Sequence, residues 1–107
     1  MSKAMSPCPL CGGPAPCARV KGKERYRRIA CPRCGRFFIK PTLPERPWAG
    51  LAWEEAQLAA FLPVYIRDRN RYRGVPLLTL ENWRALAHHG RAIRIAQLRV
   101  EKEQRSR

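Results

Sequence analysis

Four cysteines, arranged in two near-identical motifs, are the residues of this chain best suited to chemistry. The motifs are Cys8-Pro9-Leu10-Cys11-Gly12 and Cys31-Pro32-Arg33-Cys34-Gly35, with 19 residues between them from Cys11 to Cys31. Paired Cys-x-x-Cys motifs at this separation are typical of a zinc site. A tight turn can aim both thiolates of a motif at one ion, and the Gly that follows can adopt the positive φ that closes the turn. The sequence predicts one structural Zn²⁺ in a closed four-sulfur shell.

Disulfide bonds are the alternative use of these four cysteines. We expect a cytoplasmic protein, because the first fifteen residues lack the apolar core of a signal peptide. The longest apolar run, residues 58–66, has nine residues and includes Pro63, whereas a membrane span needs about 20. A reducing cytosol favours thiolate–metal sites over disulfides. Cys17 has no partner at motif spacing and is expected to be a small buried thiol.

The stretch from Cys8 to Cys34 resembles a zinc ribbon, the hairpin found in transcription factors, topoisomerase tails and ribosomal proteins. The resemblance implies a metal-bound β-hairpin. It does not choose a function, because ribbons serve nucleic-acid binding and protein docking alike. Rubredoxins also carry paired Cys-Pro-x-Cys-Gly motifs, so an iron redox carrier is a third alternative. It is disfavoured because such carriers are typically acidic and this segment is strongly basic.

The elements that must position the cysteines are expected to be short strands. Residues 17–21 and 25–30 have the pattern of strand, turn and strand, and residues 36–40 that of a third strand. The predicted fold is small α+β: an N-terminal zinc-ribbon hairpin or three-stranded sheet, followed by a helical region of about three helices. The expected divisions are a zinc ribbon over residues 1–40, a proline-rich linker over 41–52 and a helical basic region over 53–107.

Helical spacing of apolar residues begins at Trp53. Pro63 should kink this helix or start a second one. Thr79 is well placed as the N-cap of a helix over residues 80–89, which Gly90 should end. Residues 91–107 contain no helix breaker and predict a final, separate helix.

The charge of the chain points to an anionic partner. It has 22 Lys or Arg against 8 Asp or Glu, a formal net charge of +14; residues 1–40 carry +9, residues 41–66 carry −2 and residues 67–107 carry +7. Arginine outnumbers lysine 17 to 5, and the planar guanidinium suits bidentate contact with phosphate. A protein that neutralises several phosphates gains affinity through counterion release.

We therefore favour a non-enzymatic protein that binds DNA or RNA as a small subunit or accessory factor of a nucleoprotein complex. Tyr26 is a candidate for base stacking, whereas Phe37 and Phe38 fit either stacking or the core of the ribbon. The candidate phosphate-contacting residues are Lys21, Lys23, Arg25, Arg27, Arg28, Arg33, Arg36, Arg67, Arg69, Arg71, Arg73, Arg91 and Arg94. Four of these residues alternate with period two: Arg67, Arg69, Arg71 and Arg73. This spacing would put them on one face of a strand but on two faces of a helix.

The alternative is a protein-docking adaptor or inhibitor that binds a larger protein machine without touching nucleic acid. A large protein partner is expected in either case. Catalysis is not expected, because no Gly-rich phosphate loop and no obvious acid pair is present, and Ser occurs only at positions 2, 6 and 106. Neither a small-molecule substrate nor a membrane partner is predicted.

Overall fold

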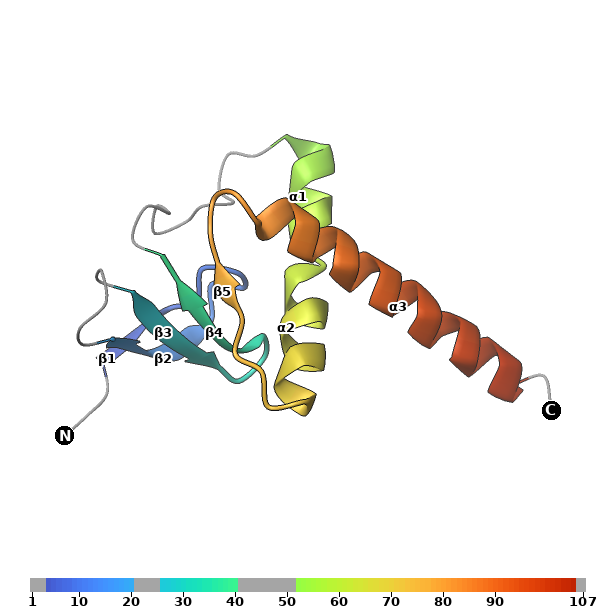
Figure 1. Ribbon diagram of the computed structural model, residues 1–107, viewed down its shortest axis with the longest axis horizontal. Coiled ribbons are helices and arrows are strands. Elements are labelled where there is room, and N and C mark those ends of the chain that lie inside the picture. The colour runs from blue at the N-terminus through green and yellow to red at the C-terminus, as the bar shows by residue number, and fades with distance from the viewer. Residues whose placement is uncertain (1–3, 21–25, 41–51, 106–107) are drawn as a thin grey trace.

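The computed structural model describes residues 4–20, 26–40 and 52–105. They form a sheet of five strands with helices beside it, and the last helix runs out from the body (Figure 1). The elements in chain order are β1 (Ala4–Pro7), β2 (Pro14–Arg19), β3 (Arg27–Cys31), β4 (Gly35–Ile39), α1 (Trp53–Ala59), α2 (Leu62–Arg71), β5 (Leu77–Leu78) and α3 (Trp83–Arg105). The small α+β class is confirmed.

The sheet has the strand order β1-β2-β3-β4-β5, so the prediction of three strands was incomplete. The first four strands pair antiparallel, whereas β5 returns after α1 and α2 and pairs with β4 in parallel. The backbone N–H of Phe38 donates to the carbonyl of Pro76 at 2.8 Å in this added pairing. β1 and β5 were missed because strands of four and two residues are too short to show an alternating pattern.

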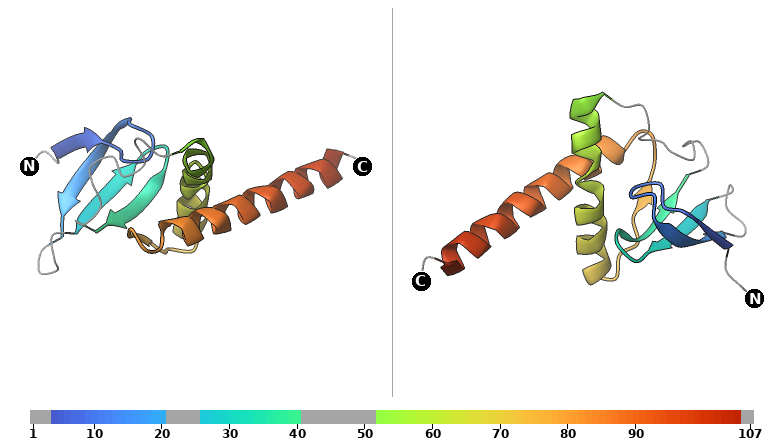
Figure 2. Two further views of the ribbon diagram at one scale, coloured as in Figure 1. Left: turned by 90° about the horizontal axis from the view of Figure 1, so that it is seen from above. Right: turned by 180° about the vertical axis from the view of Figure 1, so that it is seen from behind.

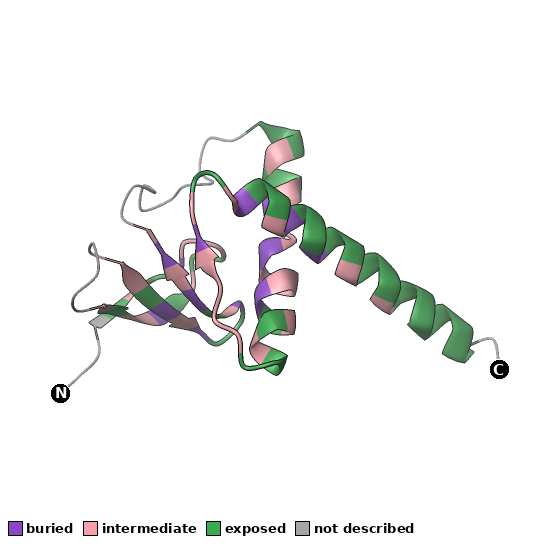
Figure 3. Cartoon of the chain, viewed as in Figure 1, coloured by how far each residue is buried: buried purple, intermediate pink, exposed green. Residues whose placement is uncertain are grey.

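One face of the sheet carries the core. Successive side chains of a strand point to opposite faces, and Ile29 of β3 lies opposite Phe37 of β4 on the buried face. Leu62 and Ile66 of α2 belong to the same buried cluster, together with Leu78 of β5 (Figure 3). The sheet and the helices therefore share one hydrophobic core.

Pro63 was expected either to kink a helix or to start a second one, and the structure shows the second outcome. It lies in the first turn of α2, where its missing N–H costs no helical hydrogen bond. Only Ala60 and Phe61 separate α1 from α2, and the two helices follow one another in the same general direction (Figure 1). They form one interrupted helical rod.

The predicted end of a helix at Gly90 was wrong, because α3 runs without a break from Trp83 to Arg105. A Cβ at Gly90 would overlap the carbonyl oxygen of Phe61, at the junction of α1 and α2. The glycine therefore allows two helix backbones to cross in contact and does not cap a helix. The described residues contain two helical rods, the α1–α2 pair and α3, and not about three separate helices.

The capping role of Thr79 was predicted correctly, although α3 begins at Trp83 and not at Leu80. The Thr79 hydroxyl accepts from the backbone N–H of Asn82 at 3.1 Å, and the Asn82 side-chain oxygen accepts from the Thr79 N–H at 2.8 Å. This reciprocal pair is a capping box.

The second part of α3, residues 91–105, is here called the projecting arm. None of its residues is buried (Figure 3). The molecule measures 51 × 33 × 22 Å, and its Cα radius of gyration is 15.0 Å, against about 13 Å for a compact chain of this length. Among the described residues, no helix has the length and apolar character that crossing a bilayer requires.

Candidate functional site

The four motif cysteines meet in one cluster, as predicted. Their sulfur atoms all lie within 4.8 Å of one another, and the Sγ atoms of Cys11 and Cys31 are 3.5 Å apart. Tetrahedral Zn–S bonds of about 2.3 Å require S···S separations of about 3.8 Å, so the cluster has the size of a metal site. All five cysteines of the chain are free thiols, and none is in a disulfide.

Tight turns at the two motifs bring the sulfurs together. In the first, the Cys8 N–H donates to the Gly13 carbonyl at 2.7 Å, and the Gly12 N–H donates to the Cys8 carbonyl at 2.8 Å. Gly12 has a φ of 75° and Gly35 a φ of 102°. Both glycines after the motifs therefore adopt the left-handed conformation that the sequence predicted.

The pKa values of the thiols show why the cluster needs a cation. A hydrogen bond with Cys34 lowers the pKa of Cys8 to about 5, and the same hydrogen bond, with burial, raises the pKa of Cys34 far above its usual value. Burial also raises the pKa of Cys31. Negative charge on Cys8 thus opposes ionisation of Cys34, and a bound cation would favour the thiolate forms of Cys31 and Cys34.

The arrangement supports a closed metal shell. Cys8, Cys31 and Cys34 are buried, whereas Cys11 is exposed at the surface. Four thiolates fill a tetrahedral shell completely, which leaves no position for a substrate or an activated water. Tetrahedral four-sulfur sites are used by both zinc and iron, so the donor set fits a metal without naming it. Within the described residues, no other group of three or more His, Cys, Asp or Glu could hold an ion.

The second cysteine motif is also the contact point of α2. The side chain of Asn70 accepts from the Arg36 N–H at 2.7 Å and donates to the Arg36 carbonyl at 3.0 Å and to the Gly74 carbonyl at 2.8 Å. A Cβ at Gly35 would lie only 2.6 Å from the Asn70 Oδ1. The end of α2 therefore packs directly against the turn that holds the metal ligands.

This contact gathers arginines from two distant parts of the chain. Arg67 donates to the Arg33 carbonyl at 3.4 Å, and Arg71 lies one turn further along the same side of α2. We call Arg33, Arg67, Arg71 and Arg73 the arginine surface; all four are exposed. The side chain of Arg36 is not part of it, because Arg36 precedes the buried Phe37 on β4 and so lies on the other face of the sheet. Because α2 is a helix, Arg69 lies on the side opposite Arg67 and Arg71. The alternating arginines are therefore divided between two faces of a helix and do not share one face of a strand.

Arg73 occupies a position that normally belongs to glycine. Its φ is 64°, and it is the only non-glycine residue with positive φ among the described residues. The Gly74 N–H donates to the Arg69 carbonyl at 2.9 Å and the Arg73 N–H to the Asn70 carbonyl at 3.0 Å, which is the Schellman pattern at the end of a helix. Tyr72, beside Arg73, is 78% exposed.

Sequence reasoning missed two residues of this region, Asn70 and Tyr72. The Asn-Arg-Tyr-Arg-Gly order at residues 70–74 is a usable signal, because Asn and Gly are common where a helix ends. Nothing in the spacing indicates that Asn70 would reach a turn 34 residues away.

The other predicted nucleic-acid residues are scattered. Arg28 is exposed opposite Phe38 on the sheet face that carries no core, whereas Arg27 and Tyr26 are half-buried. Phe37 is fully buried and Phe38 half-buried, so the core interpretation holds for Phe37. Arg91 and Arg94 are exposed on the projecting arm. Lys21, Lys23 and Arg25 lie outside the described residues.

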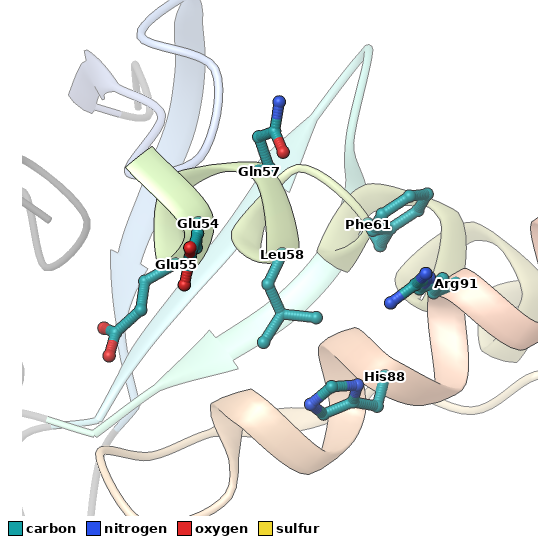
Figure 4. Close-up of a pocket in the computed structure, with 7 residues that line it drawn as sticks. All are labelled: Glu54, Glu55, Gln57, Leu58, Phe61, His88 and Arg91. Atoms are coloured by element: carbon teal, nitrogen blue, oxygen red, sulfur yellow. The ribbon is translucent and has the colours of Figure 1, made fainter. Parts of the chain in front are cut away.

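A groove between α1 and the first part of α3 is a different kind of site (Figure 4). Its lining combines apolar side chains, such as Leu58 and Phe61, with Glu54, Glu55 and Arg91. Glu55 accepts from Arg84 at 3.0 Å at the side of this groove. The carboxylates oppose the binding of a phosphate here, so the groove is not part of the arginine surface.

Searches of protein-family models, curated proteins and solved structures found no match to this chain.

Proposed function

We propose that this chain is a non-enzymatic protein in which a metal-bound cysteine cluster holds an arginine surface that binds the phosphates of nucleic acid. In this proposal it acts as a small subunit or accessory factor of a nucleoprotein complex. The observation that carries the proposal is the junction at Asn70, beside which Arg67 of α2 donates to the carbonyl of Arg33 in the second cysteine motif.

The charge of this region supports phosphate binding. The four arginines of the arginine surface are exposed, and Asp68 is the only acidic residue of α2. Most of the described acidic residues lie on α1 and α3. A concentration of guanidinium groups attracts phosphate by charge and can bind it through paired hydrogen bonds.

The backbone of Arg73 gives a second argument. A non-glycine residue in the left-handed region costs roughly 1–2 kcal/mol, and glycine would relieve that strain. Strain of this kind is retained where the side chain has a role. Arg73 and the exposed ring of Tyr72 lie together at the end of α2, where they can contact a phosphate and stack on a base.

The experiment that tests the proposal measures binding of the metal-loaded chain to labelled DNA and RNA oligonucleotides by fluorescence anisotropy. Affinity should fall steeply between 50 and 200 mM salt, because phosphate binding releases counterions. Arg71→Gln should lower the slope of log K against log salt by about 1. Arg84→Gln is the matched control and should leave the slope unchanged, because Arg84 is already paired with Glu55.

Arg73→Gly separates function from stability. The substitution relieves backbone strain and should raise the melting temperature, while the loss of the guanidinium should weaken binding. A purely structural Arg73 would give no loss of affinity. Absence of binding to any oligonucleotide at low salt would refute the proposal as a whole.

We further propose that the resident ion is Zn²⁺. Support comes from the four-thiolate shell and from the basic surface around it, which differs from the acidic character of rubredoxin-like carriers. Elemental analysis of purified protein should give one zinc per chain. Cys34→Ser should lose the metal and Cys17→Ser should retain it, since Cys17 lies outside the cluster. A stoichiometric iron content would contradict the assignment.

A protein-docking adaptor is the second candidate. The observation that favours it is exposed apolar surface: Trp53 is 75% exposed and Leu80 is 54% exposed. Such an adaptor would fail the salt-dependent binding test above. The two functions are compatible in one subunit, with nucleic acid at the arginine surface and a protein at the exposed apolar residues.

A further inference from the structure

The projecting arm is a helix exposed over its whole length. The buried residues of α3 are Trp83, Ala87 and Gly90, and all of them precede the arm. From Arg91 onward the helix leaves the body, and the views from above and from behind both show it extending away from the sheet and from α2 (Figure 2). At 1.5 Å per residue, the arm is about 22 Å long.

The charges of the arm are sorted around its axis. At 100° per residue, its five cations fall within an arc of about 140°. We call this arc the cationic strip; its charged residues are Arg91, Arg94, Arg99, Lys102 and Arg105. The two acidic residues lie outside it, Glu101 at one edge and Glu103 beyond the other. The arm therefore presents one cationic side over its whole length.

Two bulky apolar side chains lie on the same arc. Ile95 is 43% exposed and Leu98 is 48% exposed, and both fall between the cations of the strip. The side opposite the strip carries two more bulky apolar residues, Ile93 and Val100, so residues of this kind are divided between the two sides of the arm. A helix that lies on a membrane needs its bulky apolar residues opposite the cations. Because two of the four bulky apolar residues of the arm lie among its cations, the arm lacks the separate apolar side that binding to a membrane requires.

A second copy of the chain is also a poor partner for the strip. Two strips face to face would bring ten cations together, on chains that each carry a formal charge of +14. Like charges placed opposite one another are destabilising. A dense row of anions is the complementary partner.

We propose that the projecting arm binds in the major groove of double-stranded DNA, with the cationic strip against the phosphates. This inference rests on the proposed function and narrows its ligand to duplex DNA. An α-helix with its side chains is about 10–12 Å across, and the major groove of B-DNA is about 12 Å wide. The deep, narrow major groove of an RNA duplex does not admit a helix in this way.

The position of the apolar residues agrees with this binding mode. A helix in the groove directs the middle of its contacting side to the bases and the margins to the phosphates. Leu98 and Ile95 lie within the strip, where they can contact the methyl group of thymine. Arg94 and Arg99 lie at its margins.

The test compares binding of the metal-loaded full chain to a 30-base-pair DNA duplex and to an RNA duplex of the same sequence, by anisotropy. The wild-type chain should prefer the DNA duplex. The double variant Arg94→Gln/Arg99→Gln removes two phosphate contacts and should weaken DNA binding about tenfold or more at 0.1 M salt. Its binding to RNA should change much less. Circular dichroism and metal content establish that the variants are folded.

A charge-matched variant tests whether DNA affinity depends on the position of the cations in the strip or only on the net charge of the chain. Adding Ala96→Arg and Gln104→Arg to the double variant restores the net charge, but on exposed positions outside the strip. We expect this variant to bind DNA as weakly as the double variant. Recovery of wild-type affinity would overturn the groove-binding proposal.

The remaining outcomes distinguish failure of the groove-binding inference from failure of the proposed function. Equal binding of both duplexes, insensitive to the arm variants but reduced by Arg71→Gln, would overturn this inference and leave the proposed function standing. Failure to bind either duplex or any single strand would overturn both. Binding to phosphatidylserine vesicles in place of DNA, lost in the double variant, would also overturn the assignment.

Discussion

The side chain of Asn70 joins α2 to the backbone that follows the second cysteine motif. It uses both its oxygen and its nitrogen, and its three partners are backbone groups at Arg36 and Gly74. The backbone at Arg36 follows the last cysteine ligand by two residues. The side chain therefore fixes the end of α2 relative to the cysteine cluster, and with it the arrangement of the arginine surface.

Asn70→Ala should destabilise the fold by about 1–3 kcal/mol, because three backbone groups lose their partner. Asn70→Asp should also destabilise the fold, because its second carboxylate oxygen would face the carbonyls of Arg36 and Gly74 where the amide now donates. Denaturant unfolding of both variants, followed by circular dichroism, measures the difference. Equal stability of Asn70→Ala and the wild type would contradict the role given to this side chain.

Metal affinity should depend steeply on pH. The pKa values of Cys31 and Cys34 are raised, so both thiols are protonated at neutral pH in the metal-free protein. Cys8, with a pKa of about 5, is already ionised there. Binding a divalent ion at pH 7 must therefore release at least two protons, and affinity should fall about a hundredfold for each pH unit of acidification.

Proton release can be measured directly with a pH indicator in weakly buffered solution during titration with Zn²⁺. Cys17→Ser should release the same number of protons as the wild type. Release of fewer than two protons per ion would show that the cluster is already ionised without the metal.

At the scale of the elements, β5 shows how a very short strand can matter. It has two residues, yet Leu78 is fully buried in the core that joins the sheet to the helices. The parallel pairing of β5 with β4 closes a crossover around α1 and α2. The buried leucine is therefore expected to contribute much of the stability that the strand provides.

Leu78→Ala should cost about 2–5 kcal/mol, as is usual for truncation of a buried leucine. Leu80→Ala is the matched control two residues away; Leu80 is 54% exposed, and its loss should cost little. Thermal unfolding of the two variants compares them. A similar small effect at both positions would mean that β5 is not an integral part of the core.

Some elements could be predicted from the sequence because their signals are local. The cysteine motifs with their glycines, the new helix at Pro63 and the N-cap at Thr79 each follow from the chemistry of a few neighbouring residues. Gly90 and β5 could not be predicted in this way. Position 90 must be glycine because a Cβ there would overlap the carbonyl oxygen of Phe61. Strand β5 forms because it pairs with the edge of β4. In both cases the determining residues lie far away in the sequence.

At the scale of the whole molecule, the cysteine cluster and the helices share one core. The buried cluster contains Cys8, Cys31 and Cys34 together with residues of α2 and α3. A ribbon that folded separately would have its own apolar centre, whereas here Phe37 belongs to one cluster with Leu62. The cysteine cluster and the helical rods are therefore expected to unfold together.

Removal of the metal with a chelator should reduce the helical circular dichroism signal at 222 nm as well as unfold the sheet. Readdition of Zn²⁺ should restore both. A helical signal that survives chelation in full would instead show that the helices fold without the ribbon. The Cys17→Ser variant should respond to the chelator as the wild type does.

The helix crossing at Gly90 has a consequence for how the two basic regions work together. Because backbone meets backbone there, rotation of side chains cannot change the angle between α2 and α3. From that crossing, the C-terminal ends of α2 and α3 point in different directions (Figure 1). A nucleic acid that contacts the ends of both α2 and α3 would therefore do so at two points a fixed distance apart, and the protein would set that distance.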